Sequence, residues 1–203
     1  MKLNHLILSA LLMLPISGFA AAGLYDQFVI VNTGSNTYYD IGAATANTDF
    51  QGATLGTFNP GAGSTMSLGG QGKSSKNDSS DVTGMQLYYR IWQGAESGAF
   101  TAFTYNFQSD FGGGFQQWGS DVAGFNGTAF YTPGNLLTGL SNGNYTLEVY
   151  SQINTNGVNT GNPEYNTNFG NNFEASFSVV PEPSRALLAV MGLVGLIARR
   201  RRA

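Results

Sequence analysis

The stretch MQLYYRIW, residues 85–92, decides the fold class because its apolar residues recur at every second position. An extended chain points successive side chains to opposite faces, so this period predicts a β-strand with one buried face. One face of the strand carries Met85, Leu87, Tyr89 and Ile91, and the other carries Gln86, Tyr88, Arg90 and Trp92.

The same alternation recurs outward from this stretch, at residues 145–151 and 173–180. Weaker strand candidates are residues 25–31, 37–41, 53–58, 65–68 and 100–107, separated by turns rich in Gly, Pro and Asn. Residues 69–80 and 154–172 are polar and glycine-rich, which predicts loops. Such short, evenly spaced strands favour one all-β domain, an antiparallel β-sandwich or a jelly roll. The predicted core consists of Ile30, Leu87, Tyr89, Leu147, Val149, Phe173 and Phe177.

The N-terminus has the pattern of a secretory signal peptide. Lys2 provides the positive start, residues 6–16 are apolar, and Ala20, Ala21 and Ala22 are small residues suited to cleavage. Cleavage after Ala20 and cleavage after Ala22 both fit. We set the boundary at Ala22, which gives a signal peptide of residues 1–22 and a secreted domain of residues 23–179.

The C-terminal residues 180–203 form a second sorting segment. Pro181, Glu182 and Pro183 precede the uncharged residues 186–198, which span only about 20 Å as a helix, less than the roughly 30 Å hydrocarbon core of a bilayer. A cluster of arginines then favours a cytoplasmic end. We therefore predict a short, transient transmembrane helix. The cluster consists of Arg199, Arg200, Arg201 and Arg202.

This order of proline-glutamate-proline, apolar helix and basic cluster resembles the PEP-CTERM sorting tail. The resemblance implies an exported protein of an exopolysaccharide-producing Gram-negative bacterium, processed by a membrane-embedded exosortase. It also implies that Pro181, Glu182 and Pro183 are the recognition motif, while the helix and arginines hold the precursor in the inner membrane.

Residues 23–179 also resemble a β module of large secreted and surface proteins from environmental bacteria. The resemblance implies an extracellular accessory domain and assigns no catalytic residue. It rests on residues 36–40 (NTYYD), 49–52 (DFQG), 55–58 (LGTF), 87–90 (LYYR) and 143–150 (GNYTLEVY).

The charge and composition of this domain exclude several functions. Residues 23–180 hold three cations and eleven acids, a formal charge of −8, so nucleic acid is an unfavourable partner. The chain has no cysteine, and its one histidine, His5, lies in the predicted signal peptide. A Ser-His-Asp triad, a cysteine protease site and an ordinary zinc site are therefore excluded, and we expect no cofactor.

Three groups of residues remain as candidate sites. Glu148 and Glu174 are the best carboxylate pair for glycoside hydrolysis, although both positions read as solvent-facing. Asp78 and Asp81 are weak calcium candidates in a polar loop. The aromatic residues Tyr88, Trp92 and Tyr150, with Trp118 as a further candidate, could bind a sugar, although a second sheet packed on their face is the competing expectation.

These features together predict a non-enzymatic exported protein of the cell surface or exopolysaccharide matrix, with a structural or binding role. The alternatives are a carbohydrate-binding module and, less favoured, a glycoside hydrolase. The expected partners are an exosortase and exopolysaccharide.

Overall fold

The computed structural model describes residues 22–42, 45–76, 79–119, 134–158 and 162–181. The predicted signal peptide up to Ala21, the sorting residues Glu182 and Pro183, and residues 186–198 lie outside this part of the chain. The four arginines and Asp78 lie outside it as well. Among the described residues, no helix is long and apolar enough to cross a bilayer.

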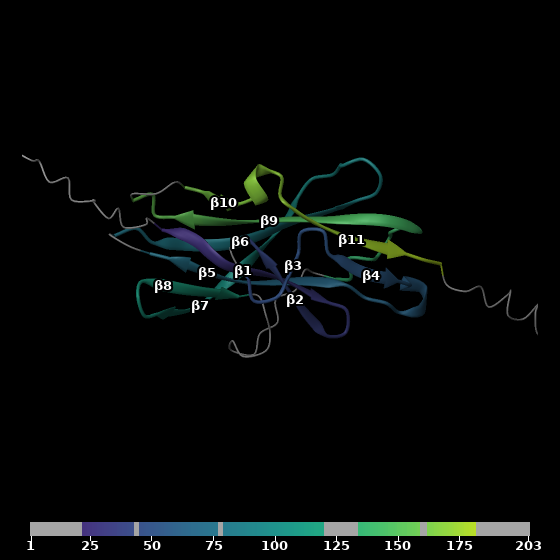
Figure 1. The fold of residues 1–203 in the computed structure, drawn as a ribbon, viewed down its shortest axis with the longest axis horizontal. Helices are drawn as coiled ribbons and strands as arrows, with labels where there is room; N and C mark the ends of the chain where they lie inside the picture. The colour runs from purple at the N-terminus through teal and green to yellow at the C-terminus, as the bar shows by residue number, and fades with distance from the viewer. Residues whose placement is uncertain (1–21, 43–44, 77–78, 120–133, 159–161, 182–203) are drawn as a thin grey trace, which may run out of the picture.

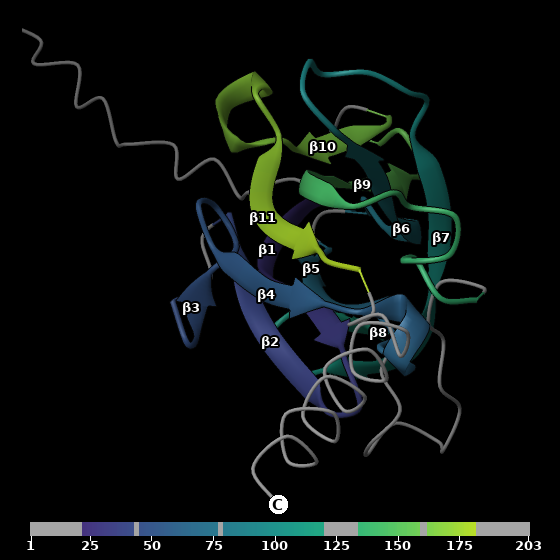
Figure 2. The same ribbon diagram turned by 90° about the vertical axis from the view of Figure 1, so that its right-hand side faces the viewer.

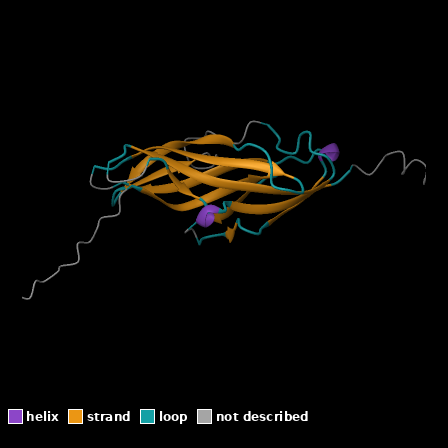
Figure 3. Cartoon of the chain, turned by 90° about the horizontal axis from the view of Figure 1, so that it is seen from above, coloured by secondary structure: helices purple, strands orange, loops and turns teal. Residues whose placement is uncertain are grey.

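The described chain is all-β, with two single 3-10 turns (Figure 3). The turns are η1 (Pro60–Ala62) and η2 (Asn168–Gly170). The strands are β1 (Gly23–Asn32), β2 (Asn36–Ile41), β3 (Thr48–Asp49), β4 (Thr54–Phe58), β5 (Ser67–Ser75), β6 (Val82–Trp92), β7 (Thr101–Phe111), β8 (Phe115–Gly119), β9 (Gly143–Thr155), β10 (Glu164–Asn166) and β11 (Phe173–Val179).

These strands form one continuous mixed sheet in the order β3-β2-β1-β5-β8-β7-β6-β9-β11-β4, with β10 added beside β9. Two pairs, β2 with β3 and β4 with β11, are parallel. The expected all-β fold is therefore confirmed, but the expectation of a purely antiparallel sheet is wrong. Each parallel pair includes a short strand, β3 in one and β4 in the other. Alternation within a strand shows which face is buried, but it does not show which strand lies beside it or in which direction that strand runs.

Strand β7 lets the sheet curl. Its first half, from Thr101 to Tyr105, pairs with β6, and its second half, from Asn106 onward, pairs with β8. A register shift between Phe107 and Ser109 marks the bend, as β-bulges commonly do. Figure 2 shows the sheet curving from β2 and β1 round to β6 and β9.

The segment between β3 and β4 joins the two ends of the curled sheet. The Phe50 amide donates to the Asp40 carbonyl at 2.9 Å, and the Gly52 amide donates to the Glu174 carbonyl at 2.7 Å. Asp40 belongs to β2 and Glu174 to β11, so three residues connect strands at opposite ends of the order. Phe50 fills the junction and is fully buried.

One core fills the inside of the curl. Six of the seven predicted core residues are buried, which confirms the alternation in β6, β9 and β11; Tyr89 is the exception. Tyr89 is half-buried at the rim, with its ring 6.4 Å from that of Phe103. Five of the six belong to this core: Leu87, Leu147, Val149, Phe173 and Phe177. Ile30 is fully buried but lies outside that hydrophobic cluster, on the opposite face of β1 from Val29 and Val31.

The loop predicted at residues 69–80 is wrong over most of its length, since β5 occupies Ser67–Ser75. Its glycines make room for large neighbours across the core. A Cβ on Gly70 would lie 1.9 Å from the Tyr105 hydroxyl, and a Cβ on Gly72 would lie 2.8 Å from the Met85 sulfur. Glycine is unfavourable in a strand by propensity, but here close packing requires it.

The loop predicted at residues 154–172 also contains ordered structure. Strand β9 extends to Thr155, and β10 pairs with it through Glu164↔Ile153, Tyr165↔Gln152 and Asn166↔Ser151. The turn η2 then crosses to β11. Three short strands, β3, β8 and β10, have no counterpart among the sequence predictions, because strands this short carry too few residues for a detectable period.

Candidate functional site

The candidate site lies on the outer face of β6, β9 and β11, opposite the core. Register places Tyr88 beside Tyr150, Arg90 beside Glu148, and Glu148 beside Glu174. The residues that alternate with them point to the core, such as Leu87 on β6, Leu147 on β9 and Ala175 on β11, so these even-numbered side chains share one outward face. The sequence alternation therefore placed Tyr88, Trp92 and Tyr150 together correctly.

Aromatic rings cover much of this surface. The Tyr88 and Tyr150 rings stack with centroids 4.7 Å apart and an interplanar angle of 3°. Phe100 meets Tyr150 edge-on at 4.9 Å, and Tyr165 of β10 lies 6.1 Å from the same ring. We call Tyr88, Trp92, Phe100, Tyr150 and Tyr165 the aromatic face.

The aromatic face remains accessible. Tyr165 is 54% exposed and the other four residues are half-buried. Within the described ranges no second sheet packs on this side, contrary to the competing expectation, because the sheet curls towards its other face and encloses the core there. Trp118 does not belong to the face: it is buried, and its indole N–H donates to Ser74 Oγ at 3.0 Å.

A largely buried ion pair lies beside the aromatic rings on the same outer face. Arg90 contacts Glu148 through two bonds, Nε to Oε2 at 2.6 Å and Nη2 to Oε1 at 2.9 Å. Trp92 Nε1 donates to Oε2 at 3.2 Å, and Asn172 Nδ2 donates to Oε1 at 2.6 Å. The Arg90 guanidinium also lies 4.3 Å from the centre of the Phe100 ring and bonds Glu96. Glu148 thus holds side chains of β6 and of the segment before β11 in place.

The environment of Glu148 keeps it ionised. Burial alone would raise the pKa of its carboxyl, but hydrogen bonds from Arg90, Asn172 and Trp92, together with the Arg90 charge, outweigh burial and lower the pKa below its ordinary value. The same pair raises the pKa of Arg90, with the hydrogen bond to Glu148 as the largest cause. Four donors share the two carboxylate oxygens of Glu148, so the group is a structural anion.

This geometry corrects the expectation that Glu148 faces solvent, since the residue is only 2% exposed. The alternation correctly placed Glu148 on the outer face, but Arg90, Trp92 and Asn172 bond its carboxylate and enclose it. Glu174 lies beside it on β11 and is half-buried. The two carboxylates are neighbours, yet Glu148 is fully occupied by its donors.

Of the two calcium candidates, only Asp81 lies in the described residues. Asp81 accepts from Gln116 Nε2 at 3.0 Å, which ties it to β8. Within the described ranges, no three acidic, histidine or cysteine side chains gather as metal ligands.

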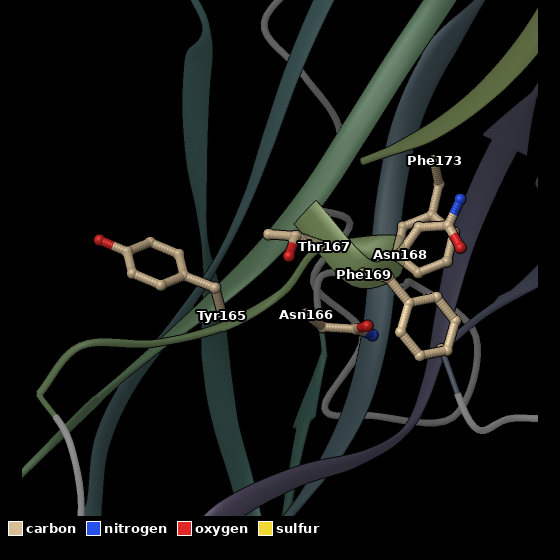
Figure 4. Close-up of a pocket in the computed structure, with 7 residues that line it drawn as sticks. Tyr165, Asn166, Thr167, Asn168, Phe169 and Phe173 are labelled. Carbon is tan, nitrogen blue, oxygen red and sulfur yellow. The ribbon is translucent and has the colours of Figure 1, made fainter. Parts of the chain in front are cut away.

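A separate pocket of about 500 Å³ lies beside the aromatic face, at η2 and the end of β2. Figure 4 shows Tyr165 at one side of it and Asn168, Phe169 and Phe173 gathered at the other. Its volume falls within the range of about 300–1,000 Å³ typical of ligand pockets. The lining residues, all uncharged, are Gly42, Tyr165, Asn166, Thr167, Asn168, Phe169 and Phe173.

No family model and no curated protein matches this chain.

Several residues of this region were not singled out from the sequence. Phe100, Tyr165, Phe169 and Asn172 come from loops or a three-residue strand, where no periodicity indicates which way a side chain points. The one available signal is the presence of aromatic residues within otherwise polar, Asn- and Gly-rich segments.

The first residue of the predicted sorting motif lies at the end of the fold. Pro181 is exposed, and its carbonyl accepts from Asn59 Nδ2 at 3.3 Å. The preceding Val180 amide donates to the Phe58 carbonyl at 2.9 Å. Figure 1 shows β1 beginning at one end of the molecule and β11 finishing at the other.

Proposed function

We propose that this chain is a non-enzymatic exported domain of the cell surface or extracellular matrix, and that its aromatic face binds neutral polysaccharide. In this proposal an exosortase reads Pro181, Glu182 and Pro183 and releases the domain from the inner membrane. The curled sheet then acts as a sandwich-like scaffold with its binding surface on one outer face.

The observation that carries the binding role is the stack of Tyr88 on Tyr150, extended by Phe100 and Tyr165 on an accessible surface. The flat apolar faces of sugar rings pack on aromatic rings, and polar side chains nearby bond their hydroxyls. Gln86 and Gln152 flank the stack as directly paired neighbours in the register of β6 and β9. Amide side chains both donate and accept, which suits hydroxyl groups.

The ion pair of Arg90 and Glu148 favours binding because it fixes the positions of neighbouring aromatic rings. Ordering a flexible side chain on binding costs about 0.5–1.5 kcal/mol of conformational entropy. Rings that are already held in place before binding lose less of this entropy. Glu148 fixes Trp92 and Arg90, and Arg90 in turn holds Phe100.

Charge favours a neutral ligand over an anionic one. The formal charge of −8 on residues 23–180 repels acidic polymers at long range. Arg90, the cation nearest the aromatic rings, is already neutralised by Glu148 and Glu96.

The glycoside hydrolase alternative is weaker. Hydrolysis requires a carboxylic acid whose pKa is raised so that it can donate a proton. Glu148 has a lowered pKa, and its oxygens accept from three side chains. Without Glu148, Glu174 lacks the second carboxylate that glycoside hydrolysis requires.

Affinity electrophoresis of the full-length chain tests the proposal. Native gels containing hydroxyethylcellulose, laminarin, galactomannan or dextran are compared with gels containing acidic alginate. We expect retardation by at least one neutral polymer and none by alginate. Tyr88→Ala and Tyr150→Ala should each weaken binding roughly tenfold or more, as loss of a central aromatic contact does.

Phe107→Ala is the matched control, because Phe107 is an exposed aromatic residue on β7 outside the aromatic face. It should bind like the wild type. Wild-type protein that no neutral polymer retards, or Tyr150→Ala protein that is retarded as strongly as wild type, would overturn the proposal.

A further inference from the structure

The η2 segment holds an unusual residue. Phe169 is completely exposed, at 103% of its reference area, and has a φ of 59°. Left-handed backbone is strained for a bulky L-residue, whereas Asn tolerates it better. Asn168 and Asn172, at φ of 33° and 58°, share this conformation within the same short segment.

The described chain offers no packing contact that offsets the backbone strain at Phe169, because its ring is fully exposed and is not buried against the core. Strained residues that persist in a folded protein cluster at ligand sites. Here the segment is fixed from both ends: the Asn172 side chain donates to Glu148, and the Asn168 side chain donates to Gln51. The strained turn is therefore held in a defined position at the rim of the pocket.

The floor of the pocket is also held in place. Asn166 Nδ2 donates to Gln27 Oε1 at 3.4 Å, and Gln27 also accepts from Ser151. Gly42 lies against the Asn166 amide so closely that a Cβ there would be 2.5 Å from Nδ2. The amide is therefore positioned before any ligand arrives.

Tyr165 connects this pocket to the aromatic face, since it lines the pocket and contacts the Tyr150 ring. Tyr88, Tyr150 and Tyr165 lie on the consecutive strands β6, β9 and β10. Neighbouring strands are about 4.8 Å apart, so this row spans roughly 10 Å across the sheet and leads to the pocket.

We propose that the pocket is a second subsite for the same polysaccharide, in which Phe169 stacks on a neutral sugar unit next to those on the aromatic face. This inference rests on the proposed function. The uncharged lining of aromatic rings, two amides and two hydroxyls matches a neutral sugar and offers no counter-charge to an acidic one.

Phe169→Gly provides the decisive test, measured with the neutral polymer that retards the wild type. Glycine relieves the left-handed strain, so the melting temperature should rise by a few degrees. Binding should nevertheless weaken roughly tenfold, because the stacking ring is lost. A residue with a purely structural role would lose stability when replaced, so the opposite directions of the two readouts identify a ligand contact.

The outcomes separate the two proposals. Phe169→Gly protein that binds as tightly as wild type, while Tyr150→Ala protein has lost binding, overturns the second subsite alone. The second subsite is also overturned if Phe169→Gly changes the self-association of the protein and leaves polymer binding unchanged. That result would assign the surface around Phe169 to contact with a second copy of the chain. Absence of any retardation of the wild type overturns both proposals. The control Phe107→Ala should leave binding close to wild type, while loss of its edge-on contact with the Trp118 ring lowers the melting temperature.

Discussion

At the residue scale, Glu148 shows how an outward position becomes a buried one. Its side chain points away from the core, yet Arg90, Trp92 and Asn172 enclose it and leave it 2% exposed. A buried ion pair contributes less to the free energy of unfolding than its geometry implies, because both charges lose their hydration on folding. Removal of one partner strongly destabilises the fold, because the other charge is then buried without a counter-ion. The role of Glu148 is therefore to fix the surrounding segments.

We predict that Glu148→Gln lowers the free energy of unfolding by about 3 kcal/mol near neutral pH, because Arg90 loses its buried counter-ion. The folded-state pKa of Glu148 lies below the unfolded value of about 4.5. Its stabilisation is thus fully present above about pH 4.5 and is lost as pH falls through the folded-state pKa. Urea unfolding of both proteins between pH 7 and pH 3 should show the difference shrinking with acid.

Glu96→Gln is the matched control for this measurement. Glu96 contacts the same arginine, but its side chain is 62% exposed, so its loss should cost no more than about 1 kcal/mol. Equal effects of the two substitutions, or a difference that is independent of pH, would contradict the structural role assigned to Glu148.

Ala22 provides a second residue-scale prediction, which concerns the start of the mature chain. Ala22 is 2% exposed, and its amide donates to Ser80 Oγ at 3.0 Å. Cleavage after Ala22 would remove this buried residue, whereas cleavage after Ala20 would retain it. We therefore expect N-terminal sequencing of the exported protein to start at Ala21, in place of the Gly23 start implied by a boundary at Ala22.

A pair of recombinant chains checks the reason for this expectation. The chain that starts at Gly23 should melt at a lower temperature than the chain that starts at Ala21. Exported protein that begins at Gly23, or equal melting temperatures for the two chains, would show that Ala22 is dispensable to the fold.

At the scale of the element, β5 is a strand selected by its partners. Its sequence, SLGGQGKSS, is poor in the β-branched and aromatic residues that favour strands. It nevertheless pairs with β1 along its whole length and with β8 along its second half. The missing side chains leave space in which Tyr105 of β7 packs against Gly70.

Gly70→Ala should therefore destabilise the domain by about 1–3 kcal/mol through overpacking. The added Cβ would lie 1.9 Å from the Tyr105 hydroxyl, and Tyr105 is too deeply buried to move aside. Gly112→Ala is the control, because that glycine has open space around its Cβ position and no positive φ. Thermal unfolding of both variants measures this difference. A Gly70→Ala protein as stable as Gly112→Ala would show that Tyr105 can shift to accommodate the added methyl group.

At the scale of the whole molecule, the folded domain ends where the proposed sorting motif begins. The backbone is hydrogen-bonded to β4 at Val180, and Pro181 is exposed. Proline keeps a segment extended and out of a following helix, which suits recognition by an enzyme at the membrane edge. Processing near Pro183 would leave every described core residue in place.

We predict that replacing Pro181, Glu182 and Pro183 with alanine traps the full-length chain in the inner membrane. Intact mass of the envelope or matrix protein from the native host should show that the wild type lacks the arginine cluster. Asn59→Ala is the control, because it removes the contact to the Pro181 carbonyl and leaves the motif unchanged. Wild-type protein that still carries Arg199 to Arg202, or unchanged delivery of the alanine variant, would contradict exosortase sorting.

The sequence by itself determined the all-β class, the strands around residues 85–92, 145–151 and 173–179, and the face on which Tyr88, Trp92 and Tyr150 lie. These features follow from alternation, which is a local property of an extended chain and survives whatever the chain packs against. The burial of Leu87 and Leu147 was predictable for the same reason.

Only the tertiary structure decided which way the sheet curls, and with it which face is covered. It also made a strand of β5, paired β4 with β11 in parallel, and enclosed Glu148 with groups distant in sequence, such as Arg90 at a separation of 58 residues. The pocket at Phe169 arises in the same way, from β10 and η2 meeting the end of β2. Long-range contacts of this kind depend on which segments the fold brings together, and no local period in the sequence records them.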